Sequence, residues 1–232
     1  MIKNVILDLG GVVVLPHCGD WFSTPRFEEV IGETRLKAVS PELLSKAKAA
    51  SAKIYLDESL MLPDEEYEFA VRRNYFLDLA KRLSWTITDR EADVLARDMT
   101  ENDARYDFYP EARETVRLLS ERYTMGILSD AMPSIKRIMG NAGYLEMFDA
   151  MAISCEIGAI KPDARMYAAI TELLEAEPQQ CVFIDDKISN VAGAEEFGMH
   201  AIHMARNGET EWPGVRAGDL MEVYRLLESG IF

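Results

Sequence analysis

The sequence predicts an α/β protein whose core is a doubly wound parallel sheet, with a separate α-helical domain inserted after the first strand. Three observations support this prediction. Short apolar runs bounded by turn residues recur along the chain, amphipathic helix patterns separate the later runs, and a long stretch after the first run shows helix signals alone. Strand–helix–strand repetition of this kind favours right-handed crossovers and a sheet covered by helices on both faces.

The strands are predicted from apolar runs that have the length of buried parallel strands. Such strands are apolar on both faces, so their sequences show no alternation of polar and apolar residues. The runs are Ile2–Leu7, Thr124–Leu128, Ala150–Ser154, Cys181–Ile184 and His200–Met204.

Helices are predicted between the later strands. The first should begin near Pro110, because proline suits the first helical position. A second follows Lys161-Pro162-Asp163, and a third should end at Gly198, where glycine is typical of a C-terminal cap.

The inserted segment carries helix start signals without any pattern that indicates a strand. Ser40-Pro41 and Pro63-Asp64 each precede a helix pattern, and Thr88 with Glu91 forms a capping box. The sequence therefore predicts a core domain formed by residues 1–16 and 104–232 and a separate helical domain, which looks like a lid, formed by residues 17–103.

The composition of the chain limits the kinds of molecule that the protein is expected to bind. The chain has 232 residues, 48% of them hydrophobic, and a formal net charge of -15. That length is enough for one sizeable core, or for one core plus a small accessory domain. So acidic a surface repels nucleic acid and anionic membranes, so we expect a small-molecule partner.

The cysteines and the N-terminal sequence indicate a cytoplasmic protein. Three widely spaced cysteines, Cys18, Cys155 and Cys181, favour neither a disulfide framework nor a zinc site, and we expect buried free thiols. The apolar run after Met1 contains Asp8 and has no small-residue cleavage site, which argues against a targeting signal. No stretch reaches membrane-spanning length.

Polar side chains follow four of the predicted strands at the point where each strand ends. In an open parallel sheet, ligands bind beyond the carboxyl ends of the strands. We therefore expect one edge of the sheet to gather an acid, a hydroxyl, an ammonium group and paired acids. These residues are Asp8, Ser129 and Asp130, Lys161, and Asp185 and Asp186.

This combination of groups has a consistent chemical meaning. Crowded carboxylates repel one another, and a bound Mg²⁺ relieves the repulsion because it prefers hard oxygen ligands and a substrate phosphate. Lys161 adds positive charge that holds Asp8 ionised and neutralises a phosphoryl oxygen, while Ser129 and the amides of the Ser129–Asp130 turn donate hydrogen bonds to the other oxygens. Asp8 is then placed to attack phosphorus and form an aspartyl-phosphate that water hydrolyses.

The residues at these strand ends resemble the four motifs of the haloacid dehalogenase-like hydrolase superfamily, and the resemblance runs the length of the chain in the family's order. The helical insertion after the first motif resembles the subfamily with a helical cap, and the core is then Rossmann-like. The motifs are Asp8-x-x-x-Val12, Ser129, Lys161-Pro162-Asp163 and Asp185-Asp186-x-x-x-Asn190-Val191.

The resemblance assigns a role to each matching residue. Asp8 becomes the nucleophile and a metal ligand, the carbonyl of Gly10 and the carboxylate of Asp186 become further ligands, and Asp185 is counted among the metal-site residues. Asp185 belongs to the same acidic set and would orient waters or Lys161. Ser129 with the Asp130 turn, and Lys161, would hold the phosphoryl group. The resemblance also implies that the first and fourth predicted strands are neighbours.

One position departs from the family's phosphatases. Most of them carry a second aspartate two residues after the nucleophile, as general acid and base, and this chain has Gly10 there. General acid catalysis contributes ~10²–10⁴-fold, so poor leaving groups should suffer most. The glycine variant resembles a branch that includes sugar-1-phosphate phosphatases. His17 is either a substitute proton donor or a surface histidine near the hinge.

Three functions follow from these residues. The first is a Mg²⁺-dependent phosphatase of a small phosphorylated metabolite, such as a sugar phosphate. The second is a binding or regulatory protein that retains phosphate and metal but lacks turnover, because Gly10 replaces the proton donor. The third is a 2-haloacid dehalogenase, for which Asp185-Asp186 is a disadvantage because their charge repels a carboxylate substrate.

Overall fold

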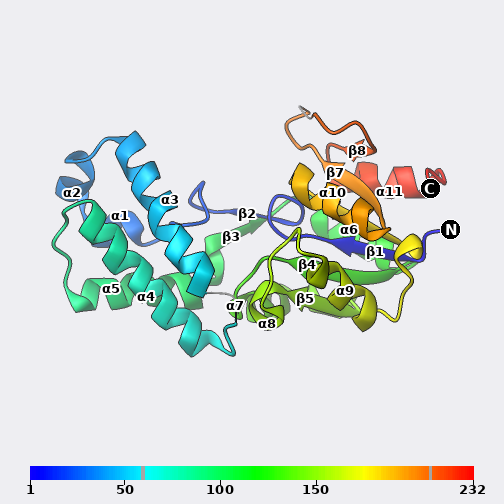
Figure 1. The fold of residues 1–232 in the computed structure, drawn as a ribbon. Helices are drawn as coiled ribbons and strands as arrows, with labels where there is room; N and C mark the ends of the chain where they lie inside the picture. The colour runs from blue at the N-terminus through cyan, green and yellow to red at the C-terminus, as the bar shows by residue number, and fades with distance from the viewer. Residues whose placement is uncertain (59–60, 209–210) are drawn as a thin grey trace. The chain divides into compact units, whose positions relative to one another are not determined.

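The computed structural model describes residues 1–58, 61–208 and 211–232, and the chain divides into two compact units (Figure 1). The core unit contains residues 1–15, 108–131 and 136–232. The helical unit contains residues 16–107 together with the short segment 132–135.

The core unit is built on a six-stranded sheet in the order β5-β4-β1-β6-β7-β8, and all of its paired strands run parallel. β1 is central, between β4 and β6, which confirms the expected neighbourhood of the first and fourth predicted strands. The strands are β1 (Asn4–Leu7), β4 (Thr124–Ser129), β5 (Ala150–Ile153), β6 (Cys181–Asp185), β7 (His200–Met204) and β8 (Arg216–Ala217).

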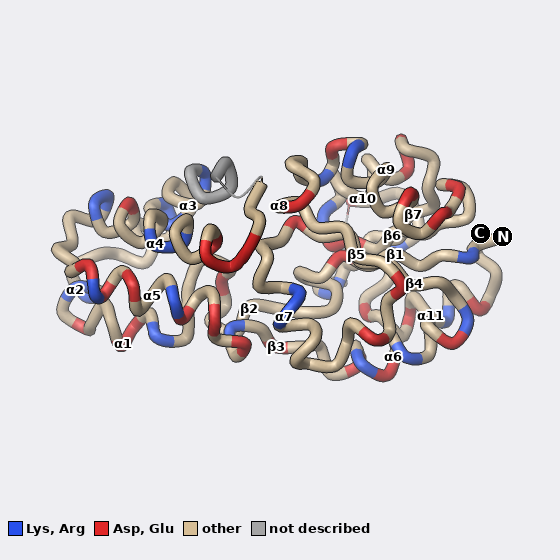
Figure 2. The backbone as a smooth tube through the Cα atoms, turned by 90° about the horizontal axis from the view of Figure 1, so that it is seen from below, with Lys and Arg blue, Asp and Glu red and all other residues tan. Residues whose placement is uncertain are grey.

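The apolar runs form this sheet because helices cover both of its faces. In Figure 2 the strands lie between α9 and α10 on one side and α6 and α11 on the other. Val5, Ile6 and Leu7 of β1 are fully buried. Ile6 belongs to a core cluster with Tyr167 of α9 and Val191 of α10, so alternate β1 side chains face opposite layers. The predicted α/β class is confirmed.

The helices of the core unit begin and end close to the predicted positions. α10 ends at Gly198, which has a left-handed φ of 100° as a C-terminal cap requires. The prediction of a helix start at Pro110 was wrong by two residues, because Glu111 is the N-cap of α6. These helices are α6 (Ala112–Ser120), α7 (Ser134–Asn141), α8 (Ser154–Ile157), α9 (Ala164–Leu173), α10 (Ile188–Phe197) and α11 (Leu220–Glu228). The first two residues of α7, Ser134 and Ile135, belong to the helical unit.

The helical unit holds five α-helices in its described part. The predicted capping box is present, since Thr88 accepts from the Glu91 backbone while the Glu91 side chain accepts from Thr88. Asp64 caps α4 by accepting from two backbone amides. The helices are α1 (Phe27–Ile31), α2 (Glu33–Lys37), α3 (Pro41–Glu58), α4 (Glu65–Arg82) and α5 (Asp89–Glu101).

Two short strands mark where the chain leaves the core unit and returns to it. β2 (Val14–Pro16) and β3 (Tyr106–Phe108) form a separate two-stranded sheet that the sequence did not predict. Three further residues, Asp103–Arg105, form a 3₁₀ turn before β3.

All three cysteines are free thiols, as expected, but only Cys155 and Cys181 are buried, while Cys18 is exposed. None of the helices in the described part of the chain has the length and apolar composition that crossing a membrane requires.

Candidate active site

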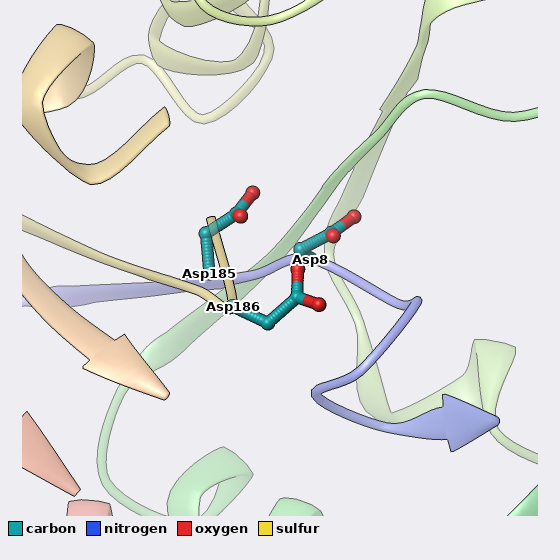
Figure 3. Close-up of side chains that lie close together, drawn as sticks. All are labelled: Asp8, Asp185 and Asp186. Carbon is teal, nitrogen blue, oxygen red and sulfur yellow. The ribbon is translucent and has the colours of Figure 1, made fainter. Parts of the chain in front are cut away.

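Three carboxylates meet where β1 and β6 end. Asp8 directly follows β1, Asp185 is the last residue of β6, and Asp186 follows it, so the pairing of β1 with β6 brings them together (Figure 3). One oxygen from each lies within 4.8 Å of the others. Asp8 and Asp185 are buried and Asp186 is exposed, so the cluster is open on the Asp186 side.

Lys161 supplies positive charge beside two of these acids, Asp8 and Asp185. Its Nζ lies 2.8 Å from Asp8 Oδ1 and 2.7 Å from Asp185 Oδ2, and it donates to the carbonyl of Leu128 at 3.1 Å. The ammonium side chain is 1% exposed. Burial alone would lower the pKa of Lys161, but the charges of Asp8 and Asp185 outweigh it and raise that pKa, so the lysine stays charged.

Asp185 is saturated by donors from its own unit. Lys161 donates to Oδ2, the Lys187 backbone amide donates to Oδ1 at 2.7 Å, and the Asn190 amide nitrogen donates to both oxygens. A carboxylate with this many donors is fixed in orientation and fully compensated despite its burial. Its geometry suits holding Lys161 in place.

Asp8 is bonded differently. Its Oδ1 is buried, lies 2.8 Å from Lys161 Nζ and accepts no hydrogen bond of standard geometry from the described residues, so Lys161 compensates it chiefly through charge. Burial raises the pKa of Asp8 from 3.8 to about 7, with Lys161 lowering it and Asp185 raising it further. This carboxylate therefore lacks part of the compensation that burial of its charge requires.

The second of the two glycines after Asp8, Gly11, is required by the local backbone and by its close approach to Asp186. Its φ is +73°, and a Cβ at this position would lie 2.4 Å from Asp186 Oδ2. Only glycine fits this combination of left-handed backbone and close approach without displacing Asp186. The turn after β1 is thus packed directly against an acid of the cluster, while Gly10, the second expected metal ligand, lies two residues past Asp8 in the same turn.

Of the residues expected to hold a phosphoryl group, Ser129 and Asp130 lie at the end of β4, while Lys161 lies in the loop between α8 and α9. Ser129 ends β4 and is buried, and its hydroxyl bonds to Asp8, lowering the pKa of that carboxyl. Asp130 accepts from the Lys161 backbone amide at 2.9 Å, and burial is the main cause that raises its own pKa. Asp130 therefore holds the chain of Lys161, a contact that the sequence did not predict.

The donor chemistry fits a hard divalent cation. All candidate ligands are oxygens, the Asp8 oxygen has unused hydrogen-bonding capacity, and desolvation and neighbouring Asp185 raise the pKa of Asp186, which an added cation would reverse. Of the two interpretations of His17, the surface one describes its environment, since its ring nitrogen lies 3.1 Å from Asp107 and its side chain is 53% exposed.

Sequence reasoning missed two residues that fix the backbone of the cluster. Asn190 was part of a recognised motif without an assigned role, and it holds Asp185. His203 of β7 contacts the carbonyl of Asp186 through Nε2 at 3.0 Å. A lone histidine inside an apolar run carries no spacing signal that would have identified it.

An α/β fold with three clustered acids at the ends of its strands, two of them paired with a buried lysine, defines a class of hydrolase, and comparison with known proteins agrees. The family model described as haloacid dehalogenase-like hydrolase matches residues 2–198. The chain belongs to this family.

The relatives in sequence include phosphatases. Phosphatase MT3486 of Mycobacterium tuberculosis is 33% identical over 123 residues, which are 52% of this chain and 56% of that protein. A phosphoserine phosphatase of Thermus thermophilus is 30% identical over 128 residues, which are 52% of this chain and 51% of that protein. The matches therefore span about half the length of these relatives.

The fold also resembles that of dehalogenases. L-2-haloacid dehalogenase of Xanthobacter autotrophicus, solved with chloropropionic acid covalently bound, superposes with a TM-score of 0.68. It is 20% identical, and the comparison covers 98% of this chain and 99% of that one. At this identity the similarity establishes the fold alone, so the choice of substrate depends on the chemistry of the site.

Proposed function

We propose that the protein is a Mg²⁺-dependent phosphatase that hydrolyses a small phosphorylated metabolite through an aspartyl-phosphate on Asp8. The observation that carries this proposal is the clustering of Asp8, Asp185 and Asp186 within 4.8 Å, with the buried Lys161 paired to Asp8 and Asp185. The named phosphatases among the relatives support it.

The saturation of Asp185 divides the acids into two groups. Asp8 and Asp186 keep oxygens for a cation, with the Gly10 carbonyl as a third ligand, while Asp185 is occupied by Lys161 and Asn190 and acts as a positioning residue. Bound Mg²⁺ would neutralise the acids and the phosphoryl oxygens, which lets two anions approach each other.

The chemical step belongs to Asp8. One carboxylate oxygen attacks phosphorus, the bond from phosphorus to the ester oxygen breaks, and the leaving group departs with the electron pair. Water then attacks phosphorus, the bond to Asp8 breaks, and phosphate leaves while the carboxylate is regenerated. Lys161 and Ser129 stabilise the charge that develops on the phosphoryl oxygens.

Gly10 narrows the class of substrate. Without an acid two residues after Asp8, the departing oxygen takes its proton from water, which is slow for the strongly basic oxygen of a simple alcohol. A less basic leaving oxygen, such as the anomeric oxygen of a sugar phosphate, depends less on that proton. We therefore propose substrates of this kind, with sugar 1-phosphates as the first group to examine.

The decisive experiment is a screen of phosphorylated metabolites and aryl phosphates with Mg²⁺, in which phosphate release is measured. We expect turnover that EDTA abolishes and Mg²⁺ restores, a trapped phosphoenzyme, and no activity in Asp8→Asn. Rates should rise steeply as the leaving group becomes more acidic. Unchanged hydrolysis in EDTA or in the variant overturns the proposal.

A second candidate is motivated by the same glycine: a protein that binds Mg²⁺ and phosphate without turnover. It predicts binding of both by calorimetry, with no phosphate released even from aryl phosphates. The screen also contains a haloacid in the presence of EDTA, because chloride release there would identify a dehalogenase instead.

A further inference from the structure

Arg206 makes an unusual set of contacts with the turn that follows Asp8. It lies two residues beyond β7, and its side chain is 16% exposed. Its Nε donates to the carbonyl of Gly11 at 2.9 Å and its Nη2 to the carbonyl of Val12 at 2.5 Å. One guanidinium thus binds two consecutive carbonyls of a segment 195 residues away.

The same guanidinium is fixed on its remaining sides. Nη1 donates to Glu111 Oε1 at 2.8 Å, and the group stacks on the ring of Tyr109 with its carbon 3.3 Å from the ring centroid. The Tyr109 amide also donates to the carbonyl of Val13 at 3.1 Å. Because its planar donors are already oriented by Glu111 and Tyr109, Arg206 presents a preformed fork to the turn.

The turn that Arg206 binds lies directly against Asp186, so its position affects the geometry of the acidic cluster. The amides of Val12, Val13 and Val14 all converge on the carbonyl of Leu9, so the turn is tight. At its apex Gly11 approaches Asp186 so closely that a Cβ would lie 2.4 Å from Oδ2. A small displacement of this turn would therefore move the Gly10 backbone relative to Asp186.

The end of β7 also fixes the backbone of Asp186. His203, on this strand, contacts the Asp186 carbonyl, and Arg206, just past its end, binds Gly11 and Val12. One strand end thus fixes both backbone segments that border the acidic cluster, although it contributes no acid to it.

We propose that Arg206 is a positioning residue that sets the distance between the Gly10-Gly11 turn and Asp186 and thereby the Mg²⁺ affinity of the site. The second half of this statement rests on the proposed function, while the clamping of the turn does not. Residues that orient metal ligands without touching the metal typically change metal affinity by about 10–100-fold when substituted.

The test compares wild-type protein with Arg206→Gln and Arg206→Lys. In metal-free protein, hydrogen exchange of the Val12–Val14 amides should become about tenfold faster or more in Arg206→Gln, because the turn opens locally. The Mg²⁺ dissociation constant, measured by calorimetry without substrate, should rise about tenfold or more. Arg206→Lys should fall between, because an ammonium keeps the charge but not the fork.

Arg113→Gln is the matched control. Arg113 also donates to two consecutive carbonyls, of Ala142 and Gly143, and lies over an aromatic ring, that of Tyr144, but it holds a different turn. We expect it to leave Mg²⁺ affinity unchanged. Circular dichroism and thermal unfolding confirm that each variant is folded.

Kinetics at low and at saturating Mg²⁺ distinguish a positioning role of Arg206 from a general structural effect. With an active substrate, the defect of Arg206→Gln should shrink at saturating Mg²⁺, with kcat recovering to within about threefold of wild type. Unchanged exchange of Val12–Val14 in Arg206→Gln overturns the clamp. Faster exchange with an unchanged Mg²⁺ dissociation constant overturns its role in metal affinity. Wild-type protein that binds no Mg²⁺ overturns the proposed function and with it this role, while the exchange result still decides the clamp.

Discussion

Each unit of the molecule buries a carboxylate beside a cation. The two carboxylates differ in how many hydrogen bonds the protein donates to them. In the helical unit, Glu68 of α4 is fully buried beside Arg72. Its Oε1 accepts from Arg72 Nε at 2.6 Å and from Ser134 Oγ at 2.7 Å, and its Oε2 accepts from the Ser134 amide at 2.8 Å. Both oxygens are therefore satisfied within the unit.

Asp8 in the core unit is also paired with a cation, but its buried charge is less fully compensated by hydrogen bonds. It is 7% exposed and paired with Lys161, but its Oδ1 accepts no standard hydrogen bond from the described residues, and its pKa is raised to about 7 by burial. A buried acid that the protein satisfies serves structure, and one that it leaves under-compensated is available for a ligand.

The largest effect is expected for Asp8→Asn. The variant retains the shape of the side chain and loses the nucleophile, so turnover of an active phosphate ester should fall by at least about 10⁴-fold. Removing an under-compensated charge should also raise the melting temperature of the metal-free protein. Calorimetry in EDTA measures this, and a lower melting temperature would contradict the contrast with Glu68.

Glu68→Ala should affect stability instead. It leaves Arg72 buried without its carboxylate and removes the acceptor for Ser134, so the free energy of unfolding should fall by about 3–5 kcal/mol. Urea denaturation measures this, with Glu66→Ala on the exposed side of α4 as the control. Activity per folded molecule should remain within about threefold of wild type, and a selective loss of kcat would show that Glu68 is more than structural.

Lys161→Met should show an intermediate effect on both properties. The methionine fills the space of the side chain, but Asp8 and Asp185 lose their common cation and the phosphoryl group loses a charge partner. We expect kcat to fall by about 10²–10³-fold. Added Mg²⁺ should stabilise this variant more than wild type, because it relieves repulsion between acids. An unchanged kcat would exclude Lys161 from the reaction.

The smallest effect is a pH dependence of stability. Because the pKa of Asp8 is raised from 3.8 to about 7, the native state binds more protons than the unfolded state between these values. The free energy of unfolding of metal-free protein should therefore carry an Asp8 contribution that falls with rising pH, by up to about 1.4 kcal/mol per pH unit.

Urea unfolding in EDTA at several pH values between 4.5 and 7.5 checks this prediction. The difference in stability between Asp8→Asn and wild type should grow across the range, because only wild type has the titrating group. Since other groups titrate in both proteins, the difference isolates Asp8. A constant difference would show that Lys161 compensates the carboxylate fully.

The strands and the acids at their ends could be predicted from sequence because both carry local signals. A buried parallel strand must be apolar throughout, so Cys181–Ile184 stands out, and the residues that follow it face the sheet edge. β8 could not be predicted, because a strand of two residues, Arg216 and Ala217, has no periodicity.

The residues that position the site could not be predicted for a different reason. Arg206 and Gly11 are 195 residues apart, and Glu68 and Ser134 are 66 apart, so each contact exists only through the fold. An arginine in a loop and a glutamate in a helix are common, and neither residue type indicates a buried partner. The reactive residues at a strand end are adjacent to the strand in sequence, while the residues that position them are distant in sequence and meet only in the folded protein.

The exposure of Cys18 gives the molecule a natural attachment point for a reporter dye. Cys155 and Cys181 are fully buried, so a maleimide should label the native protein once, in the helical unit. Partial burial, with Asp20 and Asp98 nearby, raises the pKa of the Cys18 thiol, so coupling should proceed best at mildly alkaline pH. Fluorescence could then follow the helical unit during substrate addition without an engineered cysteine.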